Sequence, residues 1–341
     1  MFCSANVGAA EEPLVLAQFF DNQGVAYAGL ISLADPAVAN TLCKISVARN
    51  ARFISRTEFG YLTNSSSNDP IHGTTQIARH VLSNVPPVVV VSVQGDVMDF
   101  AWSPDGSTLA YLLYTEDANG AANQLWLKVG SAAPRALTPP IPLFGRGGSA
   151  DDQILVRFSH DGKYLLMVDT WVSGAAPASP DQAVLQVHSV PDGGLVWVPP
   201  SALAASGNKL GSFVTMAAWS HQSDRVYYRD PAGVHSWDPT GTVSTIGAGL
   251  VWYSPSVSPD DRLVAYTVDA GGQPHIEVRD LVTSSVRVIP GTLGQPILLS
   301  DNEFIESHSG VYILNLLTKV ETPLLVVPTF VNPQAIDTWP H

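Results

Sequence analysis

Residues 100–111 of the chain read FAWSPDGSTLAY. Apolar residues alternate with small or polar ones on both sides of the central Ser103-Pro104-Asp105-Gly106, and a period of two is typical of β-strands. Proline presets its own φ, aspartate can hydrogen-bond to nearby backbone, and glycine accepts a positive φ, so the four central residues predict a tight turn. The stretch therefore predicts a β-hairpin.

Altered copies of this stretch recur along the chain. Three clear copies are VRFSHDGKYLLM (156–167), AAWSHQSDRVYY (217–228) and PSVSPDDRLVAY (255–266), and two weaker ones with a shorter turn are RFISRTEFGYL (52–62) and ILLSDNEFIES (297–307). The shared serine gives six anchor positions: Ser55, Ser103, Ser159, Ser220, Ser258 and Ser300. Repeats of roughly 40–50 residues with short strands predict a β-propeller with one four-stranded antiparallel blade per repeat. We therefore expect an all-β fold with six blades.

The repeat also resembles a known family. The WSPDG sequence at 102–106 and its later copies are similar to the Pro-Asp (WD-like) propeller repeat of TolB-like proteins, and propeller domains of prolyl-oligopeptidase enzymes carry related repeats. The resemblance covers residues 50–320 approximately and implies that the motif residues are structural, because in the family they close the hairpin between two strands. The structural repeat residues are Trp102, Ser103, Pro104, Asp105, Gly106, Ser159, Asp161, Gly162, Trp219, Ser220, Ser258, Pro259 and Asp260.

The domain organisation follows from length and pattern. The 341 residues suit one propeller domain over 1–341, without a linker or a second domain. Residues 1–12 are small and polar, and we expect a loose N-terminus. Residues 13–33 predict a strand pair that either closes the ring or caps the first blade. The segment 328–341 has three prolines and no period, which predicts an extended tail on the surface.

Charge and composition narrow the choice of partners. The net charge is −13, from 30 acidic and 17 basic residues, which argues against nucleic acid and favours neutral or basic partners. No apolar run approaches the roughly 18 residues of a transmembrane helix. No intact signal peptide begins the chain, although a processed chain would look the same. The high alanine, valine and proline content and the few lysines favour a periplasmic or extracellular protein, and we expect a bacterial monomer. Cys3 and Cys43 are either a disulfide or two free thiols.

The candidate binding residues lie in the loops that a propeller opens at one mouth of its channel. Two long insertions, 137–153 and 198–212, belong to this mouth, and loops on a rigid scaffold commonly carry function. The residues expected to border it are Asp96, Arg146, Asp152, Asp230 and Trp252. Asp96, Asp152 and Asp230 are also candidate Ca²⁺ ligands, since carboxylates from several blades supply the oxygen ligands that Ca²⁺ takes. The other interpretation of these carboxylates is that they cap their own turns in solvent.

No standard catalytic motif is present: the chain lacks G-x-S-x-G, H-E-x-x-H, a P-loop and C-x-x-C. The leading prediction is therefore a non-enzymatic, TolB-like binding propeller that presents the mouth to a protein or peptide, with no catalytic residues and no cofactor. The alternatives are a Ca²⁺-assisted hydrolase or lactonase at the mouth, and a carbohydrate-binding propeller in which Trp252 stacks on a sugar ring.

Overall fold

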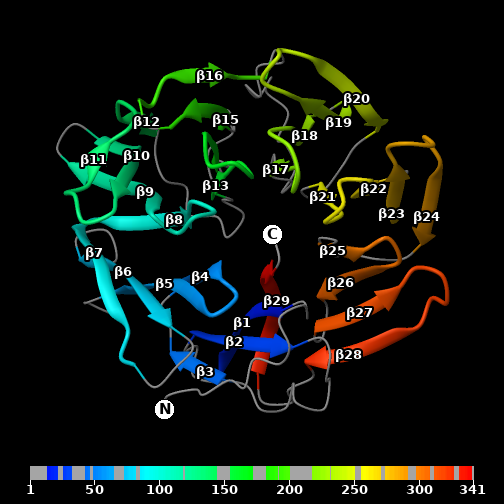
Figure 1. Ribbon diagram of the computed structural model, residues 1–341, viewed down its shortest axis with the longest axis horizontal. Coiled ribbons are helices and arrows are strands. Elements are labelled where there is room, and N and C mark those ends of the chain that lie inside the picture. The colour runs from blue at the N-terminus through cyan, green and yellow to red at the C-terminus, as the bar shows by residue number, and fades with distance from the viewer. Residues whose placement is uncertain are drawn as a thin grey trace. The chain divides into compact units, whose positions relative to one another are not determined.

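In the part of the chain that the computed structural model describes, β-strands are the only regular secondary structure (Figure 1). The described residues are 14–21, 26–32, 43–46, 49–64, 73–81, 85–117, 120–143, 154–171, 182–190, 192–199, 217–230, 232–249, 255–269, 273–290, 297–307, 311–325 and 330–339. The all-β prediction is confirmed.

Six antiparallel sheets follow one another along the chain, and the first strand of each leads into one of the six anchor serines. Each sheet has four strands, except that β12 adds a fifth to the second. In chain order the strands are β4 (Arg49–Ser55), β5 (Glu58–Asn64), β6 (Thr74–Val81) and β7 (Val88–Gln94); β8 (Asp96–Trp102), β9 (Thr108–Asp117), β10 (Gly120–Val129), β11 (Arg135–Ala136) and β12 (Ile141–Leu143); β13 (Ile154–Phe158), β14 (Tyr164–Trp171), β15 (Gln182–Ser189) and β16 (Leu195–Trp197); β17 (Ala217–Trp219), β18 (Val226–Asp230), β19 (Gly233–Trp237) and β20 (Val243–Ala248); β21 (Ser256–Val257), β22 (Leu263–Asp269), β23 (Pro274–Asp280) and β24 (Val286–Pro290); β25 (Ile297–Ser300), β26 (Glu303–Ser307), β27 (Val311–Asn315) and β28 (Glu321–Leu325).

A seventh sheet joins the two ends of the chain. Its strand order is β29-β1-β2-β3, with β1 (Leu14–Asp21), β2 (Ala26–Ser32), β3 (Cys43–Ser46) and β29 (Phe330–Trp339). The predicted count of six sheets is therefore one too few for the described residues, because this sheet has no anchor serine. The strand pair expected near the N-terminus exists and pairs with the C-terminal segment. That segment was expected to be an extended tail, and most of it is a paired strand.

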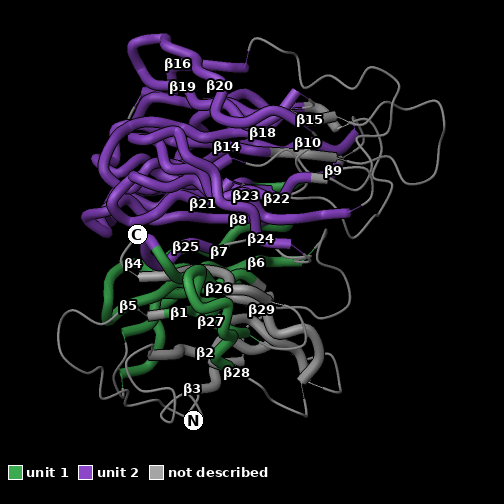
Figure 2. The backbone as a smooth tube through the Cα atoms, turned by 90° about the vertical axis from the view of Figure 1, so that its right-hand side faces the viewer, with its two compact units in different colours: residues 1–97, 113–115, 302–341 green, residues 98–112, 116–301 purple. Residues whose placement is uncertain are grey.

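The described chain forms two compact units, which Figure 2 colours separately. Unit 1 comprises residues 1–97, 113–115 and 302–341, and contains the seventh sheet and β4 to β7. Unit 2 comprises residues 98–112 and 116–301, and contains the sheets from β9 to β24. Most of the predicted hairpin turns and most of the candidate site therefore belong to unit 2.

Within unit 2 each sheet packs on the next, because side chains alternate between the two faces of a strand. On β14, Leu165 and Met167 pack against Leu112 and other residues of the preceding sheet. Leu166 and Val168, one position along, face the following sheet. This alternation of apolar residues on both faces explains why the strands after each turn read as continuous apolar runs.

Side chains on the first strands also reach from sheet to sheet. The carboxylate of Asp99 on β8 is fully buried and accepts hydrogen bonds from the backbone N–H of Val156 at 2.9 Å and from Nη1 of Arg157 at 2.8 Å, both on β13. The indole Nε1 of Trp219 on β17 donates to the carbonyl oxygen of Arg157 at 3.0 Å. Three neighbouring sheets are thus joined by buried polar contacts as well as by apolar packing.

The predicted turns share one hydrogen-bond pattern. The Ser103 N–H donates to the carbonyl oxygen of Thr108 at 2.8 Å, its hydroxyl accepts from the Thr108 N–H at 2.9 Å, and it bonds to the Asp105 carboxylate. Ser159 and Ser258 repeat this arrangement with Asp161 and Asp260. Gly106 and Gly162 have φ values of 67° and 74°, as the sequence predicts. In these three turns the serine and aspartate of the motif are hydrogen-bonded to each other and to the backbone that closes the hairpin.

The turn after Ser220 has Gln222 where the other turns have their aspartate, and it is hydrogen-bonded to an aspartate of the next sheet instead. Asp261 occupies the place of the glycine in the neighbouring turn, with φ of 59°. Its carboxylate accepts hydrogen bonds from the Ser220 hydroxyl, from the His221 N–H at 2.7 Å and from the Gln222 N–H at 3.0 Å. Asp261 therefore has a strained backbone in its own turn, while its carboxylate supplies the hydrogen-bond acceptor that the turn after Ser220 needs.

Two carboxyl groups, Asp161 and Asp224, meet where the turns after Ser159 and Ser220 approach each other. Burial raises the pKa of Asp224, and the negative charge of Asp161 raises it further. Burial also opposes ionisation of Asp161, but hydrogen bonds from Lys163 and Ser159 outweigh it and lower the pKa of Asp161 to about 2. Asp161 is the charged member of the pair, and the fold favours a neutral Asp224.

Replacing Asp224 by asparagine, which resembles the neutral carboxyl, should increase stability at neutral pH. A group whose pKa is raised on folding stabilises the fold below its unfolded pKa, here 3.8, and this contribution is lost as the pH rises through the folded value. The gain in melting temperature should therefore be present at neutral pH and vanish near about pH 3. Thermal unfolding at both pH values measures it, and an equal gain at both would contradict the carboxyl pairing.

Candidate functional site

The structure describes two of the five residues that were expected to border a binding mouth. Asp96 begins β8 and Asp230 ends β18. Arg146, Asp152 and Trp252 lie outside the described residues, as do most of the two long insertions. The binding roles predicted for those three residues stay predictions.

Asp96 is an interior residue, with 1% of its surface exposed. It belongs to unit 1. A carboxylate this deeply buried does not present its oxygen atoms to a protein partner. The burial therefore argues against the contact with a partner that its position before a strand suggested.

Asp230 holds the corner between β18 and β19. Its Oδ1 accepts hydrogen bonds from the N–H of Ala232 at 2.7 Å and from the N–H of Gly233 at 3.2 Å, which is the turn-capping role that aspartate commonly takes. The same oxygen lies 3.0 Å from Nε2 of His235. Asp230 thus caps its own turn, which is one of the two roles expected from the sequence. It also contacts His235, which was not among the predicted site residues.

His235 connects Asp230 to an exposed hydroxyl. Its Nδ1 lies 3.3 Å from Oγ1 of Thr245, which projects from β20. The side chains of His235 and Asp230 are 13% and 10% exposed, whereas Thr245 is exposed. The three residues form a polar chain, Thr245–His235–Asp230, that runs from the surface inward.

A register shift brings Thr245 opposite His235. On β20, Gly247 pairs with Val234 and Thr245 pairs with His235, so Ile246 is the extra residue of a β-bulge. Gly247 is required here, because a Cβ on it would lie 2.1 Å from the hydroxyl oxygen of Tyr266 in the next sheet. No pattern in the sequence reveals this bulge, so the pairing could not be predicted.

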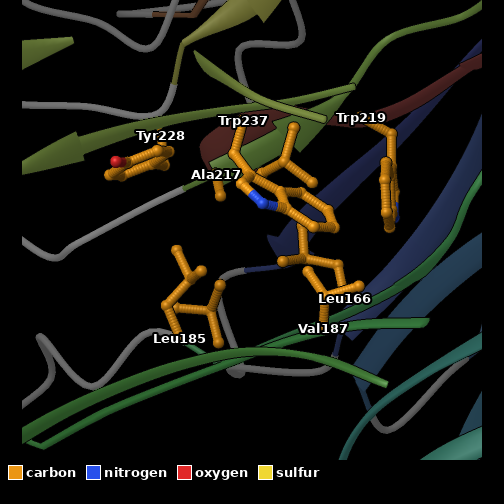
Figure 3. Packing of buried hydrophobic residues seen from close by; sticks show 9 residues of the cluster. Leu166, Leu185, Val187, Ala217, Trp219, Tyr228 and Trp237 are labelled. Atoms are coloured by element: carbon orange, nitrogen blue, oxygen red, sulfur yellow. The ribbon is translucent and has the colours of Figure 1, made fainter. Parts of the chain in front are cut away.

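One aromatic ring packs directly on the imidazole of the polar chain, and two more extend that aromatic packing. Tyr228 packs on His235 with 5.5 Å between ring centroids, and Trp197 stacks on Trp237 at 4.7 Å. Burial, and then the charge of Asp230, raise the pKa of Tyr228 to about 12. Figure 3 shows Tyr228 and Trp237 facing Leu166, Leu185 and Val187 of the preceding sheet. The aromatic packing fixes the strand that carries His235.

A second surface feature lies on unit 1. The five consecutive residues of the segment 85–89, Val-Pro-Pro-Val-Val, are all exposed. Val85, Val88 and Val89 expose 56%, 62% and 50% of their surface. The two valines after the prolines begin β7, which is the last strand of its sheet in the described residues. We call this segment the valine edge.

The described residues contain no cluster of three or more His, Cys, Asp or Glu side chains placed to hold a metal ion. They also contain no helix with the length and hydropathy needed to cross a membrane. Cys3 lies outside the described residues, so the disulfide alternative stays a prediction.

Comparison with known proteins gives the fold and no closer relationship. No family model and no curated protein matches the chain. Among solved structures, a β-propeller domain of the Trilobed protease from Pyrococcus furiosus aligns with a TM-score of 0.52 and 12% identity, over 82% of this chain and 84% of that one. A putative 6-phosphogluconolactonase from Bacteroides uniformis aligns with 0.53 and 13%, over 96% and 100%.

A prolyl endopeptidase aligns with a TM-score of 0.55 and 12% identity, over 91% of this chain and 47% of that chain, so this chain spans about half of that enzyme. TolB from Acinetobacter baumannii matches with a TM-score of 0.47 and 15% identity, over 84% of this chain and 66% of that one, which is too low to support a TolB-like assignment in particular. The chain therefore has a fold similar to β-propellers, and the TolB-like family stays a prediction.

Proposed function

We propose that the chain is a single propeller domain that acts as a binding module for a protein or peptide partner. Structures with this fold include proteases and putative lactonases, and propellers in general host unrelated functions, so the fold does not choose among them. The observation that carries the proposal is the valine edge.

The valine edge is unusual for a surface. Exposed apolar residues are normal when they are scattered, but three or four in a row are unfavourable unless they serve a function. Contiguous exposed apolar surface commonly marks a site of protein interaction. Pro86 and Pro87 restrict the backbone here, so little conformational entropy would be lost when a partner covers the segment. A partner that buries these valines removes apolar area from water at roughly 25 cal/mol per Å².

The net charge of −13 favours a neutral or basic partner. The sequence-predicted mouth residues Arg146, Asp152 and Trp252 remain part of the proposal as a second contact region, where Arg146 would orient a carboxylate or carbonyl. We propose that the protein acts in the periplasm or outside the cell, as the sequence analysis expects. Its partner would then be a protein of the same compartment.

The alternative of a Ca²⁺-assisted hydrolase has less support from the described candidates. Oδ1 of Asp230 already accepts two backbone hydrogen bonds and contacts His235, and Asp152 lies outside the described residues. The carbohydrate-binding alternative depends on Trp252, which lies outside the described residues. The binding module is therefore the function that the described geometry favours.

Val88→Glu tests the proposal. The introduced charge would be desolvated in the complex, so we expect the affinity for the captured partner to fall at least about tenfold. The matched control is Val282→Glu, which places the same charge on a valine that is 80% exposed in another part of the chain. Affinity capture from the native source followed by titration with the purified partner measures both. Equal affinities for Val88→Glu and the parent protein would refute the valine edge as the binding surface.

A further inference from the structure

We infer that the hydroxyl of Thr245 is a nucleophile that accepts an acyl group from an ester. His235 activates this hydroxyl, and Asp230 orients His235. This reactivity goes beyond partner binding and is independent of it. The inference rests on the polar chain Thr245–His235–Asp230, whose hydrogen-bond directions follow from the acceptor character of the carboxylate.

The direction of the hydrogen bonds is set at the buried end. Oδ1 of Asp230 accepts from the N–H groups of Ala232 and Gly233, so it acts as an acceptor, and Nε2 of His235 must donate to it. A neutral imidazole with its proton on Nε2 has a free lone pair on Nδ1. The hydroxyl of Thr245, 3.3 Å away, therefore donates its proton to Nδ1. The proton of the hydroxyl points at a base.

Exposure and packing suit the same role. Thr245 is exposed, so a small ester can reach it, whereas the base and the carboxylate that orients it are largely shielded. The ring of Tyr228 packs on the imidazole and holds its orientation. Nucleophilic catalysis by a hydroxyl requires this order: a nucleophile within reach of a base, and a third group that orients the base.

The chemistry is acyl transfer. Oγ1 of Thr245 attacks the carbonyl carbon of the ester, and its proton passes to Nδ1 of His235 while Asp230 stabilises the imidazolium that forms. The ester C–O bond breaks, the leaving alcohol takes the proton from His235, and Thr245 carries the acyl group as a new ester. Water then attacks this ester with His235 as the base, which releases the acid and restores the hydroxyl.

Acetylation by p-nitrophenyl acetate tests the inference, with mass spectrometry of the digested protein to locate the acetyl group. We expect acetylation of Thr245, and a rate at least about tenfold lower in His235→Gln, since general bases contribute about 10²–10⁴ in rate. Asp230→Asn should lower the rate as well, because the amide can donate to Nε2 and so favour a proton on Nδ1. Thr245→Val should abolish the signal, and Thr245→Ser should retain it.

Thr240 is an internal control. It is an exposed threonine whose hydroxyl donates to a carboxylate, that of Asp238, in place of an imidazole. The inference is overturned if Thr240 is acetylated as fast as Thr245, if His235→Gln leaves the rate at Thr245 unchanged, or if only amines are labelled. Circular dichroism of each variant separates loss of the fold from loss of reactivity.

Discussion

Asp99→Ala should lower the free energy of unfolding by about 3 kcal/mol, one of the two largest effects that we expect from a single substitution. The Asp99 carboxylate is fully buried and accepts hydrogen bonds from the Val156 N–H and the Arg157 guanidinium. Removing one partner of such a group leaves the other without compensation, which costs about 3–5 kcal/mol. Arg157 retains some contact with water, since 27% of its side chain is exposed, so the lower end of that range applies.

Two further variants separate the causes. Asp99→Asn keeps an oxygen that can accept from the Val156 N–H, but it loses the charge and replaces the other oxygen by an amide NH₂, so it should destabilise the protein less than Asp99→Ala does. Asp105→Ala removes an exposed turn carboxylate and should cost about 1 kcal/mol. Urea unfolding of the three proteins gives the comparison. An Asp99→Ala cost no greater than that of Asp105→Ala would show that the contact between sheets contributes little.

Asp261→Gly should destabilise the protein by about 2 kcal/mol, although it relieves backbone strain. Glycine at a φ of 59° is favourable by roughly 1 kcal/mol. The substitution also removes three hydrogen bonds that Ser220, His221 and Gln222 donate to the carboxylate, each contributing about 1 kcal/mol. The loss exceeds the gain.

Lys319→Gly is the matched control for the strain. Lys319 is exposed and has nearly the same φ, 58°, so its replacement by glycine should stabilise the protein by up to about 1 kcal/mol. Thermal unfolding distinguishes the two cases by the sign of the change. If Asp261→Gly is also stabilising, the carboxylate does not complete the neighbouring turn.

The turns were predictable because their residues act locally. Proline, aspartate and glycine set the backbone of four consecutive residues, so the hairpins at Ser103, Ser159 and Ser258 could be located from the sequence alone. The turn after Ser220 could be located but not explained, because the carboxylate that completes it comes from Asp261, about 40 residues later in the chain.

The seventh sheet was predicted only in part: a strand pair was expected in 13–33, but the C-terminal strand was not, for a different reason. Its strand β29 contains Pro333, and proline argues against a strand. The structure places this proline where the pairing of β1 with β29 shifts register, between Gln18 and Phe20 on the opposite strand. A bulge tolerates the missing N–H, so a segment without a period of two still forms a paired strand.

Of the three residues in the polar chain, only Asp230 was predicted from the sequence as a site residue. Asp230 was selected because it follows a strand, and its turn-capping role was one of the two alternatives considered. His235 and Thr245 were not selected, because their contact depends on the bulge at Ile246. The valine edge belongs to an apolar run in the sequence, and only the structure shows that the first residues of this run are exposed.

The central claim, that the valine edge is a binding surface for a protein, is tested most directly by photo-cross-linking in the native source. A photoreactive amino acid replaces Val88 in one protein and Val282 in another, since both side chains are well exposed. We predict one dominant cross-linked protein from position 88 that is absent from position 282. No dominant product from position 88, or the same products from both positions, would contradict the claim.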